Sequence, residues 1–309
     1  MRRLLRTPWI WSWLAALAVW LATIVGSGGR GAGEILTAAL SFSAFTVLVS
    51  LGQMLVITLG PGNVDLSIPA TIALASAVSM LAMNENGAMI LPGLAAAAGA
   101  GALVGLFNFG LIRLLRIPPI IATLSSSLIV TSVAIAIGRG LKTKPPAAFS
   151  DFVTAKLYGV PLLALLVLAF AALMAVVVER TTYGRAVSAI GQNRRAAHFS
   201  GVAVERTRLA TYVLCAALAG LTGAFIAGFS GGNSLDQGQE YLLLTIAVVV
   251  IGGTAVAGGR ASVPGVGGAA LFMFLLVTML NAAGYGAGLR LLLTGLIIIA
   301  VIAAAGGQQ

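Results

Sequence analysis

Residues able to do chemistry are scarce in this sequence. One histidine, His198, and one cysteine, Cys215, occur among its 309 residues, so a metal site built from these ligand types is excluded. His198 lies in a basic loop and is expected to be solvated, while Cys215 lies in an apolar block and is expected in the core. An enzyme needs a nucleophile, acid or base with a partner. The sequence offers no such set, which argues against an enzyme.

Seven polar side chains interrupt or border long apolar runs and are our candidates for a solute pathway. Each can equally form a hydrogen bond between helices. Asp65 is the one carboxylate at the edge of such a run, so it either contacts solute or caps the helix that follows. Ion-coupled carriers usually need titratable groups inside their bundle. Such groups are nearly absent from the apolar runs of this sequence, which favours a conduit whose energy comes from another protein chain. The seven candidates are Asn63, Asp65, Ser67, Asn108, Thr123, Ser125 and Asn281.

A basic segment at 179–207 is the longest polar connection of the inner side. Apolar residues recur at helical spacing between 186 and 190, which predicts a short amphipathic helix ended by Gly191. A second short helix is predicted over about 193–199, with a stop at Gly201. Such a helix, with small residues beside arginines, can dock into a groove of a partner protein. The alternative is a loop that only sets membrane topology.

A glycine-rich run at 251–268 could be mistaken for a nucleotide cradle. A P-loop requires Gly-x-x-x-x-Gly-Lys-Ser/Thr, and here Gly259 stands where the lysine would be. The run follows an apolar stretch, so we interpret it as part of a discontinuous or kinked span. Its candidate hinge or packing glycines are Gly252, Gly253, Gly258 and Gly259.

The elements that must position these residues are apolar throughout. Of the chain, 59% is hydrophobic and 8% charged, whereas a soluble domain carries about 25% charged residues, so lipid is the expected surroundings. The small-residue run 93–105 is expected at a tightly packed helix seam. The sequence predicts an all-α, polytopic transmembrane bundle forming a single domain over 1–309. Since about 20 residues cross a bilayer, ten spans are predicted, at about 8–25, 36–60, 65–83, 88–112, 117–138, 160–178, 208–229, 242–259, 263–282 and 288–306.

The loop charges predict both termini on the cytoplasmic side. In that orientation the inner segments hold twelve Lys and Arg against three Asp and Glu, and the outer segments hold six against five, as positively charged cytoplasmic loops require. The segment 179–207 is then cytoplasmic and 139–159 periplasmic. The net charge of +10 sits in short loops, so it indicates topology rather than a nucleic-acid surface. Three arginines precede the run 8–25, which we interpret as an uncleaved first helix, with signal-peptide cleavage as the alternative.

Taken together, these segments resemble the permease subunits of ribose-type carbohydrate uptake ABC importers, in the superfamily shared with branched-chain amino acid permeases. The blocks near 182–202 and 251–260 are similar to the sugar branch more than to the amino acid branch. The resemblance covers nearly the whole chain and rests on residues 62–67, on Asn108 with 117–124, on 182–202, and on 251–260 with Gly265.

This resemblance implies that 183–202 couples the chain to an ATPase subunit. It also implies a homodimer or paired permease, two cytoplasmic ATP-binding subunits and a periplasmic solute-binding protein, assembled in the bacterial inner membrane. ATP and magnesium would bind those partner subunits, so the chain itself would need no cofactor and no metal. The positions that match the coupling pattern are Tyr183, Gly184, Arg185, Ser188, Ile190, Gly191, Asn193, Arg194, Arg195, Ala196, Phe199, Ser200 and Gly201.

Two places depart from the family pattern. Residues 68–69 are Ile-Pro where small residues and Val-Gly are more usual, and 234–241 is more polar than expected. Both are places where contacts with solute or binding protein can differ. The expected function is import of a sugar or related polyol by alternating access, powered by separate ATPase subunits. The alternatives are a branched-chain amino acid-type permease, an ion-coupled secondary carrier and a non-transporting scaffold.

Overall fold

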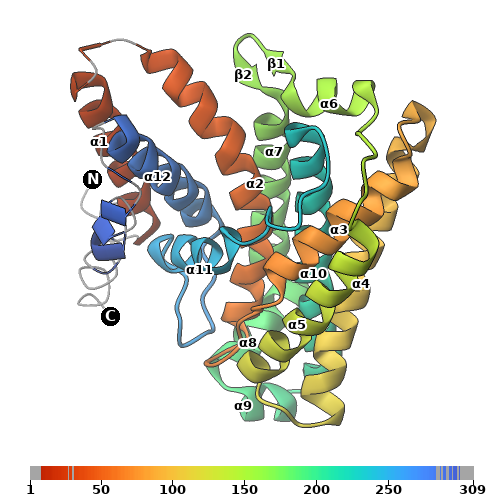
Figure 1. The fold of residues 1–309 in the computed structure, drawn as a ribbon. Helices are drawn as coiled ribbons and strands as arrows, with labels where there is room; N and C mark the ends of the chain where they lie inside the picture. The colour runs from red at the N-terminus through yellow and green to blue at the C-terminus, as the bar shows by residue number, and fades with distance from the viewer. Residues whose placement is uncertain are drawn as a thin grey trace.

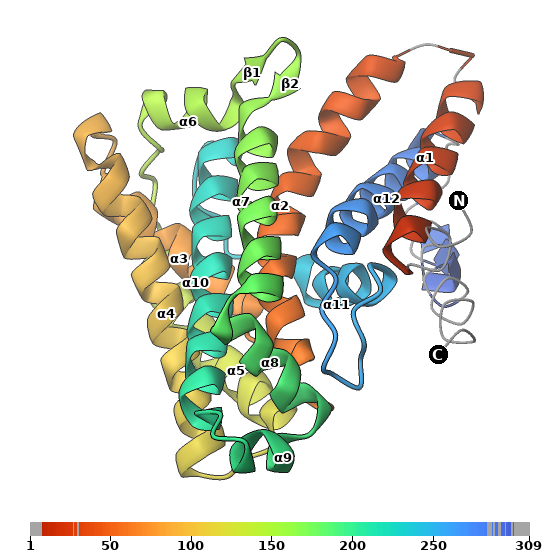
Figure 2. The same ribbon diagram turned by 180° about the vertical axis from the view of Figure 1, so that it is seen from behind.

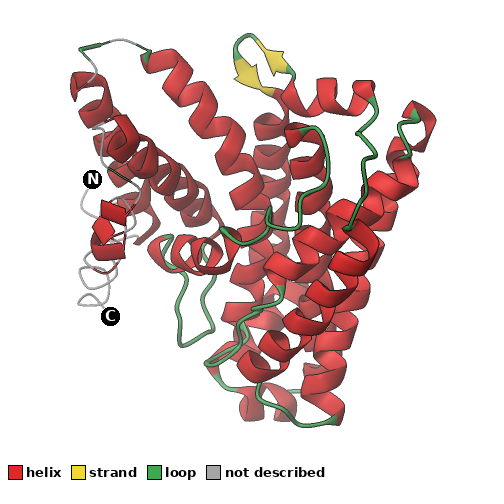
Figure 3. Ribbon diagram, viewed as in Figure 1, coloured by secondary structure: helices red, strands yellow, loops and turns green. Residues whose placement is uncertain are grey.

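A computed structural model describes residues 8–282 except 27 and 30, together with 286, 288–289, 292–293, 295–297 and 299. Within that part the chain is a bundle of α-helices with one short antiparallel hairpin (Figure 3), which confirms the all-α class. The elements in chain order are α1 (Pro8–Gly26), α2 (Ala32–Thr58), α3 (Ile68–Met83), the 3₁₀ helix η2 (Gly87–Met89), α4 (Ile90–Leu114), α5 (Pro119–Gly138), α6 (Ala147–Thr154), β1 (Lys156–Leu157), β2 (Val160–Pro161), α7 (Leu162–Arg180), α8 (Thr182–Gln192), α9 (Arg194–Phe199), α10 (Val204–Ser230), α11 (Tyr241–Ile251) and α12 (Val263–Ala282).

Seven helices of the described part are long and apolar enough to cross a membrane: α1, α2, α4, α5, α7, α10 and α12. Helix α3 has 16 residues and α11 has 11, and at 1.5 Å per residue α11 reaches only about 16 Å. The predicted eighth span, 242–259, is therefore wrong as a continuous helix. It ends at Ile251 because the chain then turns through glycines with positive φ. Most of the predicted tenth span, 288–306, lies outside the described residues.

Helix α10 lies among α2, α3, α4 and α7 in both views of the molecule (Figures 1 and 2). Its contact with α4 depends on glycines, as the small-residue run predicted. A Cβ placed on Gly101 would stand 2.1 Å from the Ala216 carbonyl oxygen, and one on Gly105 would stand 2.4 Å from that of Tyr212. Backbone therefore meets backbone along this seam, which confirms the packing prediction.

The two ends of the bundle differ in structure. Helices α8 and α9 project at one end, whereas α6 and the hairpin β1–β2 cover the opposite end (Figure 1). The prediction of two short helices within 179–207 is confirmed, with the first ending at Gln192 and the second at Phe199. Residues 139–159 were expected as a simple loop but contain α6 and the strand β1.

Three irregular segments connect helices of the bundle, and each has buried and exposed parts. They are residues 59–67 before α3, 231–240 before α11, and 252–262 after α11. Helix α11 itself lies crosswise at about mid-height in Figure 1. Irregular backbone at membrane depth is stable only where it is buried in protein or lines a wet cavity. These segments therefore carry the residues of functional interest.

Candidate functional site

A buried network of hydrogen bonds joins the segment 59–67 to α4 and α5. The Asp65 carboxylate accepts from the Ser67 amide at 2.9 Å and from its hydroxyl at 2.6 Å. The Asn108 amide, on α4, donates to Ser67 Oγ at 2.8 Å. The Ser126 hydroxyl donates to Asn108 Oδ1, and Thr123 Oγ1 accepts from the Leu66 amide at 3.1 Å. Asp65 therefore orders the turn that leads into α3, but its bonds go to Ser67 and not to an amide inside the first turn of α3, so α3 has no side-chain cap.

Helices α2 and α10 complete this network from the other side. Gln53 Oε1, on α2, accepts from the Asp65 amide at 3.2 Å, and the Tyr212 hydroxyl, on α10, donates to Asn63 Oδ1 at 3.0 Å. Gln53 and Tyr212 are fully buried, as are Asn108 of α4 and Thr123 and Ser126 of α5. The network ties the start of α3 to four helices and has little contact with solvent, which favours interhelical bonding.

Five of the seven pathway candidates meet in this network and two do not. Ser125 is exposed on α5, one residue from the buried Ser126, and Asn281 is exposed in the last turn of α12. Three network members were missed by sequence reasoning: Gln53, Ser126 and Tyr212. Ser126 could have been found, because it lies three residues after Thr123 and so shares its helix face. A pathway role for the seven stays a prediction.

Helices α8 and α9 each begin with a side-chain cap. Thr181 Oγ1 accepts from the Gly184 amide at 3.2 Å, and Asn193 Oδ1 accepts from the Ala196 amide at 2.9 Å. Of the predicted coupling residues, one face is buried: Gly184, Ile190 and Gly191, with Tyr183 and Ser188 half-buried. The other face is exposed and consists of Arg185, Asn193, Arg194, Arg195, Ala196, Phe199, Ser200 and Gly201.

Tyr183 fastens the first of these helices to α10. Its hydroxyl lies 3.0 Å from Thr211 Oγ1, and burial raises the pKa of the Tyr183 phenol above its ordinary value, because desolvation disfavours the phenolate. The phenol therefore remains a neutral hydrogen-bonding group over the physiological pH range. Helix α8 is thus held to a long helix of the bundle at its N-terminal end.

Gly191, at the C-terminal end of α8, fits against the backbone at the end of α2 and in the irregular segment after α11. A Cβ at this position would stand 1.9 Å from the Thr58 carbonyl oxygen and 2.3 Å from the Gly259 nitrogen. Those two atoms are bonded to each other, since the Gly259 amide donates to Thr58 O at 2.9 Å. A Cβ on Gly258 would likewise stand 2.4 Å from Gly60 Cα. We call Gly60, Gly191, Gly258 and Gly259 the glycine junction.

The other two candidate hinge glycines, Gly252 and Gly253, lie earlier in the same segment, directly after α11. Gly253 has φ +86°, a conformation that side chains rarely adopt. Gly252 ends α11 with right-handed helical angles, and a Cβ there would stand 2.7 Å from the Gly265 carbonyl carbon. Both positions thus require glycine for shape, whereas a hinge motion at Gly252, Gly253, Gly258 or Gly259 stays a prediction.

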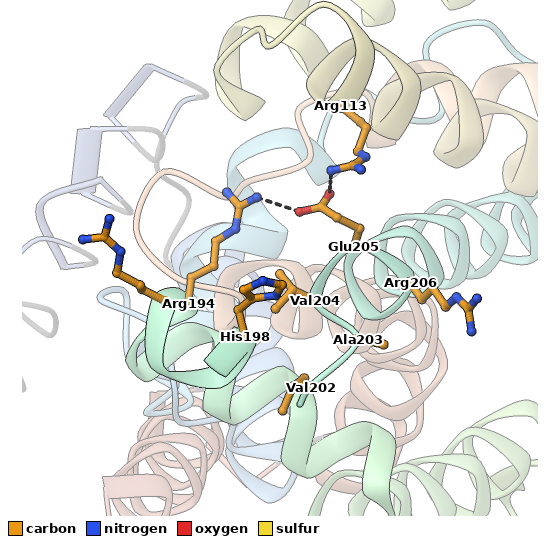
Figure 4. Close-up of a pocket in the computed structure, with 9 residues that line it drawn as sticks. Arg113, Arg194, His198, Val202, Ala203, Val204, Glu205 and Arg206 are labelled. Atoms are coloured by element: carbon orange, nitrogen blue, oxygen red, sulfur yellow. Dashed lines mark hydrogen bonds and ion pairs between the residues drawn. The ribbon is translucent and has the colours of Figure 1, made fainter. Parts of the chain in front are cut away.

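Glu205, at the start of α10, is the centre of an ion-pair cluster (Figure 4). Its carboxylate lies 2.6 Å from Arg194 on α9, 3.2 Å from Arg113 on α4 and 3.3 Å from Arg208 on α10. The cluster borders an open cavity of about 680 Å³ that His198 also lines. One carboxylate therefore connects the second short helix to two long helices of the bundle.

Comparisons with known proteins identify a family for this chain. A family model described as "Branched-chain amino acid transport system / permease component" matches residues 35–302. Among similar proteins is the "Autoinducer 2 import system permease protein LsrD" of Salmonella typhi, 28% identical over 306 residues, with 96% of this chain and 92% of the relative covered. The protein of the same name from Photorhabdus laumondii is 29% identical over 298 residues, with 94% and 89% covered.

No solved structure matches this chain. The family match covers most of the sequence and includes the buried network, α8, α9 and the glycine junction. The seven long apolar helices agree with a multi-pass membrane protein. The chain therefore belongs to the branched-chain amino acid transport system / permease component family.

Proposed function

We propose that this chain is the membrane-spanning permease subunit of an ABC importer in the bacterial inner membrane. In this proposal it moves a sugar or related polyol by alternating access, and separate ATPase subunits supply the energy. The observation that carries the proposal is the projection formed by α8 and α9. Its inner face is fixed to the bundle at Tyr183 and Gly191, whereas its outer face is exposed.

The exposed face of this projection has the composition of a protein interface. Arg185, Arg194 and Arg195 are exposed, and Phe199 is 81% exposed at the end of α9. Arginine and aromatic residues are enriched where protein surfaces bind each other. A cytoplasmic ATPase subunit is the partner that the family membership indicates. In the proposed orientation, α8 and α9 face the cytoplasmic ATPase subunit and both termini lie in the cytoplasm.

The remaining partners follow from the same proposal. Two permease subunits, identical or paired, form the conduit, two ATP-binding subunits bind ATP and magnesium, and a periplasmic binding protein delivers solute. The chain itself is not the catalyst, because its glycine-rich run 251–268 lacks the P-loop lysine. The names of the relatives, as import system permease proteins, support this division of labour.

The solute class has two candidates. The resemblance to ribose-type permeases supports a sugar or polyol, whereas the printed description of the matching family names branched-chain amino acids. The ligand specificity of a binding protein purified with the complex distinguishes these two solute classes. We expect sugars or polyols to raise its melting temperature, and stabilisation by leucine, isoleucine or valine alone would assign the amino acid alternative.

Reconstitution tests the transport proposal directly. The chain, its ATPase subunit and its binding protein are placed in proteoliposomes, and uptake of the identified solute is measured with and without ATP in the compartment that contains the ATPase. We expect uptake only with all three components and ATP. Uptake by this chain alone, driven by an ion gradient, would refute the proposal in favour of a secondary carrier.

Charge reversal tests the assignment of α8 and α9 to the ATPase contact. Arg194→Glu with Arg195→Glu is expected to abolish co-purification of the ATPase subunit or lower uptake at least tenfold. Arg139→Glu, an exposed reversal at the opposite end of the bundle, is the control and leaves both unchanged. Intact co-purification and uptake in the double variant would show that the projection is not the ATPase contact.

A further inference from the structure

The segment 231–240 leaves the end of α10 and runs down into the bundle to the start of α11 (Figure 1); we call it the descending segment. It begins at the bundle end opposite α8 and α9. Its Gly231 has φ +81°, and after it the chain continues without regular secondary structure to Glu240. The segment combines a position within the bundle with exposed polar side chains, which is unusual for a membrane protein.

Packing contacts fix how far the descending segment enters the bundle. Leu235 packs against an apolar cluster of α3, α4 and α5, and a Cβ on Gly138, the last residue of α5, would stand 3.2 Å from Leu235 Cδ2. Gly238 lies deeper along α3, where a Cβ would stand 2.1 Å from the Pro69 carbonyl oxygen. Because the 20 residues of α5 rise about 30 Å, these contacts lie within the hydrocarbon thickness of a bilayer.

One glutamine holds the descending segment in place. Gln237 Oε1 accepts from the Ser76 hydroxyl of α3 at 3.0 Å. Gln237 Nε2 donates to Ser230 Oγ at 2.8 Å and to the Gly232 carbonyl at 2.9 Å. The side chain thus uses both polar ends to tie α3, α10 and its own segment together. This anchoring keeps the neighbouring residues at a defined depth.

Four polar side chains around that anchor remain exposed: Ser234, Asp236, Gln239 and Glu240. Neither Asp236 nor Glu240 forms an ion pair with any residue that the structure describes. A carboxylate facing lipid at this depth would cost several kcal/mol, and irregular backbone is tolerated there only beside protein or water. The face of the descending segment that carries these side chains therefore borders water or another protein subunit rather than lipid.

We propose that the descending segment lines the outer vestibule of the solute pathway and contacts the solute there. This inference rests on the proposed function and narrows it. Hydroxyl groups of a sugar or polyol can donate to the two carboxylates and to Gln239. A free amino acid presents an ammonium that these carboxylates can bind, but it also presents a carboxylate, and the segment from 231 to 240 contains no lysine or arginine to pair with that group. The segment thus offers acceptors for the hydroxyl groups of a sugar or polyol but leaves the carboxylate of an amino acid unpaired.

Thiol labelling tests whether this face is wet. Gln239→Cys and Ser234→Cys are made in the full permease, and a charged, membrane-impermeant methanethiosulfonate is added from the periplasmic side. The wild-type protein is the blank, because its one thiol, Cys215, is fully buried. The matched controls are Leu128→Cys and Leu168→Cys, at positions 70% and 63% exposed on α5 and α7.

We expect both test thiols to react at least tenfold faster than the control thiols, because the reagent needs water and a thiolate. Saturating solute-loaded binding protein is expected to slow their reaction. Labelling no faster than at Leu128→Cys would overturn the proposal by showing a surface covered by lipid or by a second permease copy. Fast labelling without protection, in complexes with proven uptake, would overturn the solute contact. Labelling needs neither ATP nor the ATPase subunit, so its outcome is separate from that of the uptake experiment.

Discussion

Gly191→Ala adds one methyl group where α8 meets the glycine junction. The new Cβ would stand 1.9 Å from Thr58 O and 2.3 Å from the Gly259 nitrogen, so reaching an ordinary contact of about 3.5 Å requires a shift of roughly 1.5 Å. Both neighbours are backbone atoms and cannot turn away. Seating α8 in its present position therefore requires a displacement of the main chain on one side.

The cost follows from two effects. Overpacking of a tight site costs about 1–3 kcal/mol. Breaking the hydrogen bond from the Gly259 amide to Thr58 O by the added methyl group costs about 1 kcal/mol more. A total of about 2–4 kcal/mol corresponds to a factor of roughly 30–1,000 in the population with α8 seated. We expect solute uptake to fall by at least tenfold while the helical bundle stays folded.

The assay compares uptake, ATPase rate and thermal unfolding of the purified complex. Gly110→Ala is the matched control, because Gly110 lies within α4 and a Cβ there meets nothing within 4 Å. It should preserve uptake and stabilise α4 slightly, since alanine favours helix over glycine by about 1 kcal/mol. Wild-type uptake and ATPase rates in Gly191→Ala would refute the reasoning that α8 must sit against the junction.

Two further substitutions test the buried contacts. Glu205→Gln removes the carboxylate paired with the buried Arg208, so a lower melting temperature and several-fold weaker uptake are expected. The control is Glu179→Gln, which makes the same charge change at an exposed position and should behave like wild type. Asn108→Leu removes the donor to Ser67 Oγ and one acceptor of the Ser126 hydroxyl at a fully buried site, which should destabilise the fold by about 1–3 kcal/mol. The exposed Ser125→Ala is the control, and equal unfolding temperatures of the two variants would contradict the network.

Local sequence patterns were sufficient where local contacts decide the structure. The two short helices within 179–207 were predicted from apolar spacing and from Gly191 and Gly201, and their caps at Thr181 and Asn193 each act on the residue three positions further on. Span lengths of the long helices were likewise predictable from hydropathy. The break after α11 was predicted from the glycines of 251–268, but the bounds of the span 242–259 were not, because the chain turns directly after Ile251 for reasons of tertiary packing.

The members of the buried network show the limit of such reasoning. Ser125 and Ser126 are adjacent and chemically identical, yet the first is exposed and the second is buried. Successive residues point about 100° apart on a helix, so only knowledge of the neighbouring helices decides which one faces inward. The Glu205 cluster is a stronger example. Its carboxylate meets arginines from α4, α9 and α10, and no spacing in the sequence connects those three elements.

Helix α10 connects all of these features along its axis. At its start Glu205 meets α9, and two turns further Thr211 and Tyr212 contact α8 and the segment 59–67. Its far end continues into the descending segment. Because an α-helix is stiff along its axis, a displacement of α8 and α9 that moves one end of α10 must also move the other. A partner acting on the projection can therefore change the proposed vestibule without a contact between the two.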